Sequence, residues 1–226
     1  MDLVREFGVI VLAYLLGAVP FGFIFVKLRT GKDIRDVQSG RTGGTNAMRA
    51  AGWAIGITTG VVDVLKGAAA VWLARALVPG NVWLEILCPL AAIVGHNYSI
   101  FLIKRLPDGK LRLGGGAGGA TCLGGSFGLW SPSLLIILPL GILIFYFVGY
   151  ASVTTMSAAL LAIVIFGLRA ALGLSPWQYI LYGVFAELLL LWALRPNIKR
   201  LMEGTERLHG YRARKKEPTA QDAAPE

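Results

Sequence analysis

The sequence is poor in charged residues and in cysteine. Charged residues make up 15% of the 226 positions, against roughly 25% in a soluble domain, which argues against a soluble fold. The two cysteines, Cys88 and Cys122, lie in apolar stretches, so they indicate small core residues and not a disulfide framework or a metal site. No segment alternates apolar and polar residues as a membrane barrel strand does, so strands are not expected.

Long apolar runs are what the chain has instead. Hydrophobic residues make up 55% of it, the mean hydropathy is +0.64, and a helix that crosses a bilayer needs about 20 mostly apolar residues. We therefore predict an all-α polytopic integral membrane protein with about seven transmembrane helices. They are expected at 3–27, 54–79, 82–103, 116–131, 133–150, 152–170 and 176–194.

The two ends of the chain differ in character. The first apolar run continues past Pro20, and Asp2 and Glu6 precede it, which favours a retained first helix over a cleaved signal peptide. We expect residues 1–210 to form one transmembrane domain and residues 211–226 to form a polar, disordered cytoplasmic tail.

The formal net charge of +9 is concentrated on one side of the predicted bundle. Most of the 22 Lys and Arg residues lie in segments 27–49, 104–112 and 195–216. The positive-inside rule places these segments in the cytoplasm, with the N-terminus outside and the C-terminus cytoplasmic. Topology thus accounts for the charge: we expect contact with membrane lipids and no nucleic acid partner.

Three polar segments share the predicted cytoplasmic side. The first is QSGRTGGTNAMR, residues 38–49. Successive glycine amides can converge on an anion, and Ser39, Thr45 and Asn46 add neutral donors. Arg41 and Arg49 carry permanent charge suited to bidentate phosphate contacts. Phosphate binding is favoured over simple anchoring to lipid headgroups.

The second segment, LRLGGGAGGAT at 111–121, has two equally supported interpretations. It can be the start of a helix that holds phosphate, or Gly115 and Gly119 can form a GxxxG packing face. A dinucleotide site is rejected because no strand is predicted before it. The third segment, RPNIKRLMEGTERLHG at 195–210, can contact anionic lipid, but that role does not require Asn197 or Glu206.

Ionisable residues inside predicted spans are costly and indicate function. Asp63 and Lys66 lie three residues apart, so they share a helix face and can pair. His96 ends a span near the same side and is more often structural than catalytic. Glu187 can pair with His96 or with Lys66, and the sequence leaves this choice open.

Taken in order, these motifs resemble the acyl-phosphate-dependent glycerol-3-phosphate acyltransferases, the PlsY family. SGRTGGTNAMR is similar to the family's first motif, and VVDVLKGAAAV to its Asp-x-x-Lys-Gly helix. AAIVGHNYSIFL with GGGAGGAT occupies the place of its Gly-His segment and glycine-rich loop. RPNIKRLMEGTE resembles its closing motif. The resemblance covers almost the whole chain.

The resemblance implies transfer of a fatty acyl group from acyl phosphate to the 1-hydroxyl of glycerol 3-phosphate, giving lysophosphatidic acid and phosphate in phospholipid biosynthesis. It implies a cell-membrane enzyme without cofactor or metal, and no oligomeric state is indicated. The implied catalytic residues are Ser39, Arg49, Asn197 and Glu206. The implied substrate-binding or phosphate-binding residues are Gly43, Gly44, Thr45, Asn46, Asp63, Lys66, His96, Gly115, Gly116, Gly118 and Thr121.

The chain also departs from the family pattern. Arg41 stands where the family has Asn, Gly44 where it has Ala, Gly114 and Ala117 where it has lysines, and Leu194 where it has a histidine. We expect Arg41, with Lys110 and Arg112 of an inserted segment, to supply the missing positive charge. Two other functions are considered: a non-catalytic paralogue that binds lipid phosphate, and a small transporter using the intramembrane charges, for which no inverted repeat is evident.

Overall fold

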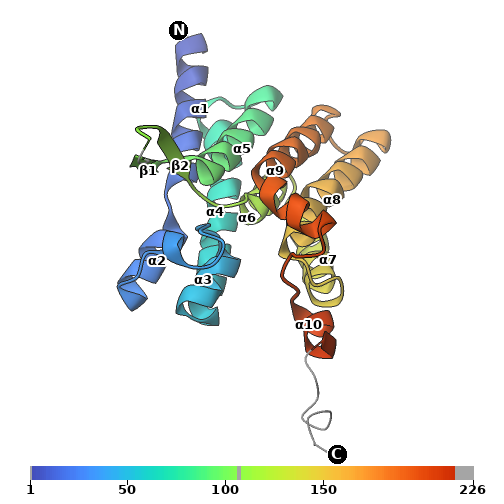
Figure 1. Ribbon diagram of the computed structural model, residues 1–226. Helices are drawn as coiled ribbons and strands as arrows, with labels where there is room; N and C mark the ends of the chain where they lie inside the picture. Colours follow the sequence, from blue (N-terminus) through green and yellow to red (C-terminus); the bar gives the residue numbers. More distant parts are fainter. Residues whose placement is uncertain (1, 106–107, 217–226) are drawn as a thin grey trace, which may run out of the picture.

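The computed structural model describes residues 2–105 and 108–216 and is mostly helical (Figure 1). In chain order its elements are α1 (Asp2–Ala18), α2 (Phe21–Thr30), η1 (Ile34–Asp36), α3 (Gly44–Ala51), α4 (Trp53–Leu77), α5 (Val82–Asn97), β1 (Ser99–Arg105), β2 (Leu111–Gly114), α6 (Gly119–Leu129), α7 (Ser133–Phe147), α8 (Ala151–Ala171), α9 (Gln178–Met202) and α10 (Gly210–Lys216).

Each of the seven predicted spans overlaps at least one of these helices. Within the described residues, four helical segments are long and apolar enough to cross a membrane, namely Leu3–Thr30, α4, α8 and α9. Helices α5 and α7 are apolar but shorter, and α6 has 11 residues. The structure supports a multi-pass helical membrane protein, with these four segments as candidate crossings.

The expectation of no strands was wrong after α5. That helix ends at Asn97, short of the predicted 103, and β1 then pairs with β2 as an antiparallel hairpin. Ser99 ties the chain just after α5 to the end of α1, because its hydroxyl donates to the Ala18 carbonyl over 2.6 Å. The glycine-rich segment therefore does follow a strand, but in a hairpin and not in the strand–helix–strand unit of a dinucleotide site.

Three other boundaries differ from the sequence interpretation. The first polar segment is a loop only up to Gly43, since α3 begins at Gly44. Helix α9 continues past Pro196 to Met202, so the third polar segment begins inside a helix. Helix α10 (Gly210–Lys216) covers the first six residues of the expected polar tail, 211–216, and residues 217–226 lie outside the described residues.

Glycines bring α4 and α6 into backbone contact. A β-carbon at Gly67 of α4 would overlap the carbonyl oxygen of Thr121, and one at Gly124 of α6 would overlap the carbonyl oxygen of Val64. Small residues allow such close approach between membrane helices. The two cysteines lie buried in the apolar clusters around these helices, as the sequence predicted.

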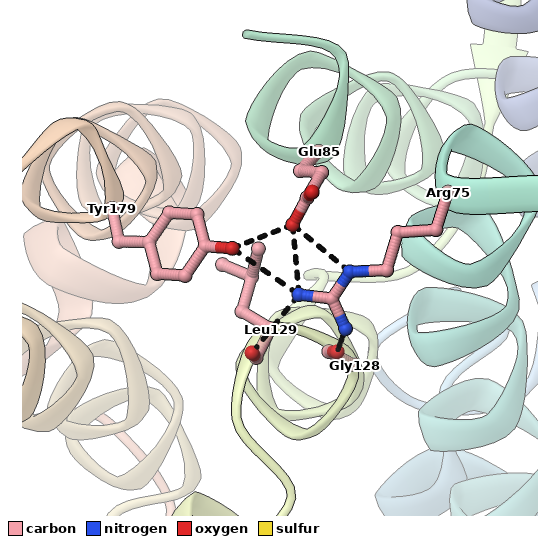
Figure 2. Close-up of polar contacts among 5 residues, drawn as sticks. All are labelled: Arg75, Glu85, Gly128, Leu129 and Tyr179. Carbon is pink, nitrogen blue, oxygen red and sulfur yellow. Dashed lines mark hydrogen bonds and ion pairs between the residues drawn. The ribbon is translucent and has the colours of Figure 1, made fainter. Parts of the chain in front are cut away.

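A polar cluster joins α4, α5, α6 and α9 at the end of α4 that lies away from α3 (Figures 1 and 2). The Arg75 guanidinium contacts Glu85 at 2.7 Å and donates to the carbonyls of Gly128 and Leu129 at the C-terminus of α6. The Tyr179 hydroxyl donates to the same carboxylate oxygen of Glu85 over 2.5 Å. These contacts link residues of α4, α5, α6 and α9, so the cluster stabilises the packing of four helices.

Replacing Glu85 with alanine is expected to destabilise the bundle. Removing the carboxylate leaves Arg75 and Tyr179 without their shared acceptor. We expect a loss of about 3 kcal/mol, the lower end for breaking a buried ion pair, because the Arg75 side chain is 38% exposed. Chemical unfolding in detergent measures this loss. Glu85→Gln keeps an acceptor oxygen and should lose less, and equal losses for the two variants would contradict this account.

Candidate functional site

A cavity of about 920 Å³ lies among α3, α4, α6, α7, α8 and α9. In Figure 1, α3 and α4 stand on one side of it and α7, α8 and α9 on the other. One wall is polar and comes from residues 38–49 and 197–209. The other wall is apolar and comes mainly from α7, through Ile137, Leu138, Ile142 and Phe145. The cavity is therefore amphipathic.

Two helices begin at this cavity. Helix α3 begins after Gly43 and α6 begins after Gly118, and neither first turn is capped by a side chain. Both helix starts line the cavity. The first N–H groups of a helix have no partner within it and carry partial positive charge, which suits an anion. Gly118 has a φ of 87°, a left-handed conformation that glycine adopts without strain.

Arg41 lines the cavity and bridges distant parts of the chain. Its guanidinium donates to the Ala193 carbonyl over 2.6 Å, to Asn197 Oδ1 over 3.1 Å and to the Gly116 carbonyl over 3.4 Å. All three acceptors are neutral. Burial and the neighbouring Arg200 lower the pKa of Arg41, but a guanidinium stays charged in proteins. Arg41 thus brings a charge that none of these contacts neutralises.

Glu206 orients the residues around Arg41. Its two carboxylate oxygens accept from the Ser152 hydroxyl over 2.7 Å and from the Asn197 side-chain amide over 3.0 Å. Asn197 then presents its Oδ1 to Arg41. Glu206 therefore holds Asn197 in position. Both residues belong to the third polar segment of the sequence analysis.

Arg49 projects from the last turn of α3 into the same wall. Its Nη2 lies 2.6 Å from Nε2 of His209, and both residues line the cavity. Burial, followed by the charge of Arg207, lowers the pKa of Arg49. Ser39 also lines the cavity and is exposed within it. The neighbouring Gln38 has a positive φ of 43°, a strained conformation of the kind that gathers at functional sites.

The predicted intramembrane pair is confirmed and sits beside the cavity. Lys66 Nζ contacts Asp63 Oδ1 at 2.9 Å and His96 Nδ1 at 2.8 Å. In the described part of the chain both Lys66 and His96 contact Asp63, and neither bonds to Glu187, so the pairing considered for Glu187 was wrong. Asp63 and His96 line the cavity, whereas Lys66 lies behind them.

Several predicted binding residues instead hold the framework. The Asn46 amide nitrogen lies 3.2 Å or less from three loop carbonyls, those of Ile34, Val37 and Arg41. Gly115 and Gly116 pack against Asn97 and His96, where a β-carbon would overlap them, and Thr121 packs against Gly67. Of the predicted set, Gly43, Gly44, Thr45, Asn46 and Gly118 line the cavity, and Gly115, Gly116 and Thr121 do not.

Lys110 and Arg112 do not reach the cavity. They lie on the β1–β2 hairpin, which stands beside α1 and α5, on the far side of α4 from α7 (Figure 1). Lys110 is exposed and pairs with Asp108. The expectation that Lys110 and Arg112 supply positive charge at the site was wrong, because β1 and β2 pair with each other and keep this segment away from the cavity. Of Arg41, Lys110 and Arg112, the three residues expected to replace the family's lysines, Arg41 lines the cavity.

The structure adds residues that the sequence interpretation missed. Arg200, Arg207 and His209 lie in the third polar segment and line the cavity, but their charges were assigned to lipid contact. Ser152 lies in the first turn of α8 and carried no sequence signal at all. These residues bring three further nitrogen-bearing side chains to a site that already holds Arg41 and Arg49.

The fold and this cavity define a helical membrane protein with an amphipathic cavity whose polar side carries several arginines. The family model described as glycerol-3-phosphate acyltransferase matches residues 7–204. A glycerol-3-phosphate acyltransferase of Thermus thermophilus is 39% identical over 204 residues, covering 90% of this chain and 95% of the relative. One of Rubrobacter xylanophilus is 39% identical over 208 residues, covering 92% and 97%.

Solved structures agree with these relatives. The crystal structure of PlsY (YgiH), an integral membrane glycerol 3-phosphate acyltransferase in its glycerol 3-phosphate form, superposes with a TM-score of 0.77 and 29% identity. It covers 94% of this chain and 99% of that one. A lysophosphatidic acid form of the same protein superposes with a TM-score of 0.74. This chain belongs to the glycerol-3-phosphate acyltransferase family.

Proposed function

We propose that this protein transfers a fatty acyl group from acyl phosphate to the 1-hydroxyl of glycerol 3-phosphate. The products are lysophosphatidic acid and inorganic phosphate. The observation that carries the proposal is the amphipathic cavity, whose polar wall holds Arg41, Arg49 and two helix starts, and whose other wall is the apolar face of α7. Both substrates carry a phosphate, which suits the polar wall. The donor also carries an alkyl chain, which suits the apolar wall.

The reaction needs alignment more than activation. Acyl phosphate is already an activated donor. The glycerol hydroxyl attacks its carbonyl carbon, an ester bond forms, the bond from carbon to the phosphate oxygen breaks, and the hydroxyl proton is released. Holding both substrates in one cavity in attack geometry therefore supplies much of the rate. Positive groups beside the departing phosphate stabilise the charge that develops there.

Each polar residue has a distinct proposed role. Arg49 and the start of α3 bind one phosphate. Arg41 and the start of α6 bind the other, with Asn197 and Glu206 holding Arg41 in place. Ser39 hydrogen-bonds a phosphate or orients the attacking hydroxyl. The acyl chain lies along α7.

The experiment that tests this function is an assay of the purified protein in liposomes with glycerol 3-phosphate and palmitoyl phosphate. We expect lysophosphatidic acid and inorganic phosphate to appear in equal amounts. Acyl-CoA supplied in place of palmitoyl phosphate tests the choice of donor and should give no product. If glycerol 3-phosphate binds but neither donor gives product, the protein is a phosphate-binding paralogue and the proposal fails.

We propose an orientation with the N-terminus outside and the cavity opening, the hairpin and the C-terminus in the cytoplasm, on the strength of the charge distribution. Asp108 on the hairpin has a half-exposed side chain, and Cys88 and Cys122 are buried. With both native cysteines replaced by alanine, Asp108→Cys is expected to react with an impermeant maleimide in inverted vesicles only. Labelling of Asp108→Cys in intact cells would instead place the hairpin outside and contradict the proposed orientation.

A further inference from the structure

The segment after α9, residues 203–209, crosses the polar wall and is held from several sides; we name it the C-terminal strap. Arg207 donates to the Gln38 side chain over 2.5 Å, in the loop before α3. The His209 backbone N–H donates to the Gly149 carbonyl between α7 and α8 over 2.8 Å. These contacts place the imidazole of His209 at the cavity, between Arg49 and the end of α7.

The His209 ring is held in a defined plane. It stacks on Phe145 of α7 with ring centroids 5.2 Å apart and an interplanar angle of 22°. Its Nε2 faces Arg49 Nη2 at 2.6 Å. A guanidinium has donors only, so Nε2 must accept, which requires a neutral imidazole with its proton on Nδ1. A protonated ring would place two cations in contact instead.

We propose that His209 is a positioning residue for Arg49 and makes the anion site sensitive to pH. Neutral His209 holds the Arg49 guanidinium at the cavity wall, and protonated His209 repels it. This inference rests on the proposed function insofar as Arg49 binds a substrate phosphate. Nothing in the family motifs quoted above falls on position 209.

The charges that face His209 set the direction of the effect. Arg49 faces it from α3, Arg207 and Glu206 face it from the strap itself, and α7 contributes the uncharged Phe145. Burial, then Arg49 and Arg207, lower the pKa of His209 below its usual value, and Glu206 opposes them. His209 is therefore neutral at neutral pH, and the contact with Arg49 is lost as the pH falls through this lowered pKa.

Steady-state kinetics of wild type and His209→Gln between about pH 5 and pH 8 test the proposal. A glutamine oxygen can accept from Arg49 at every pH. The ratio of wild-type to variant kcat/KM is therefore expected to fall about threefold to fivefold towards acidic pH, the size expected for a partly exposed charge pair. Substrate phosphates also titrate near pH 6, but they do so equally for both proteins and cancel in the ratio. A ratio that is constant with pH overturns the proposal.

Histidine NMR gives a readout that does not need activity. The chain has two histidines, so protein labelled at histidine and purified without a histidine tag should give two imidazole signals, and His209→Gln removes one. In Arg49→Ala we expect the pKa of His209 to rise, because a neighbouring cation is gone, whereas Arg112→Ala on the distant hairpin should leave it unchanged. An unchanged pKa in Arg49→Ala overturns the contact. Failure of the wild type to transfer acyl groups, with this coupling present, would instead overturn the proposed function.

Discussion

Replacing Arg49 with alanine is expected to lower kcat/KM by about 100-fold, equivalent to roughly 2.7 kcal/mol of transition-state stabilisation. Arg49 reaches the cavity from the last turn of α3, and its guanidinium hydrogen-bonds to neutral His209. Its charge is therefore available for a substrate phosphate, and a charge-assisted contact is about twice as strong as a neutral one. Neutral donors nearby, such as Thr45, cannot replace it.

The measurement is steady-state kinetics with each substrate varied in turn, supported by thermal melting of each variant in detergent. Arg49→Lys keeps the charge but loses the planar fork, so we expect partial recovery. The matched control is Arg112→Ala, which removes one arginine from the exposed hairpin and should leave kcat/KM at the wild-type value. Equal kcat/KM for Arg49→Ala and wild type, at matched expression, would remove Arg49 from the proposed site.

Arg41→Asn is expected to impair the enzyme by about tenfold to 100-fold, although it restores the residue that the family motif has at this position. Asparagine removes one of the cations that line the cavity. It is also too short to bridge from the loop to Ala193 and Asn197, as Arg41 does. The loss should therefore appear in kcat as well as in KM.

Two companion variants separate charge from bridging. Arg41→Lys keeps the charge and loses the planar fork, whereas Arg41→Gln keeps a donor amide without charge. Ala117 lines the same cavity, so Ala117→Lys added to Arg41→Asn should recover part of the lost activity by supplying a cation from the glycine-rich segment. If Arg41→Asn matches wild type and Ala117→Lys adds nothing, Arg41 does not replace the family's lysines.

Hydropathy predicted the helices because each long apolar run has few ways to satisfy its backbone within a bilayer. Spacing of three residues likewise predicted the Asp63–Lys66 pair, since both lie on one helix face. The same reasoning missed the hairpin after α5. Its strands pair with each other, so the residues around Ile103 satisfy their backbone without a helix, and hydropathy alone does not distinguish these two solutions.

The contacts that build the polar wall were beyond the reach of sequence reasoning. Arg41 meets Asn197 and Arg49 meets His209 across more than 150 positions of the chain, and no local pattern encodes such pairs. Membrane topology was enough to explain the charges of the third polar segment. The sequence therefore offered no reason to place His209 at the cavity. The motif order gave the family, while the geometry separates residues that line the cavity from residues that hold its framework.

The glycine contacts between α4 and α6 limit where an acyl donor can enter the cavity from the bilayer and where the lipid product can leave. Two backbones that already touch at Gly67 and Gly124 leave no side chains that can rotate aside, so that seam stays shut. Helix α7 is different, because among its described residues only Ser133 and Ile137 are buried. We therefore expect alkyl chains to pass between the bilayer and the cavity beside α7, because packing holds few of its side chains in place.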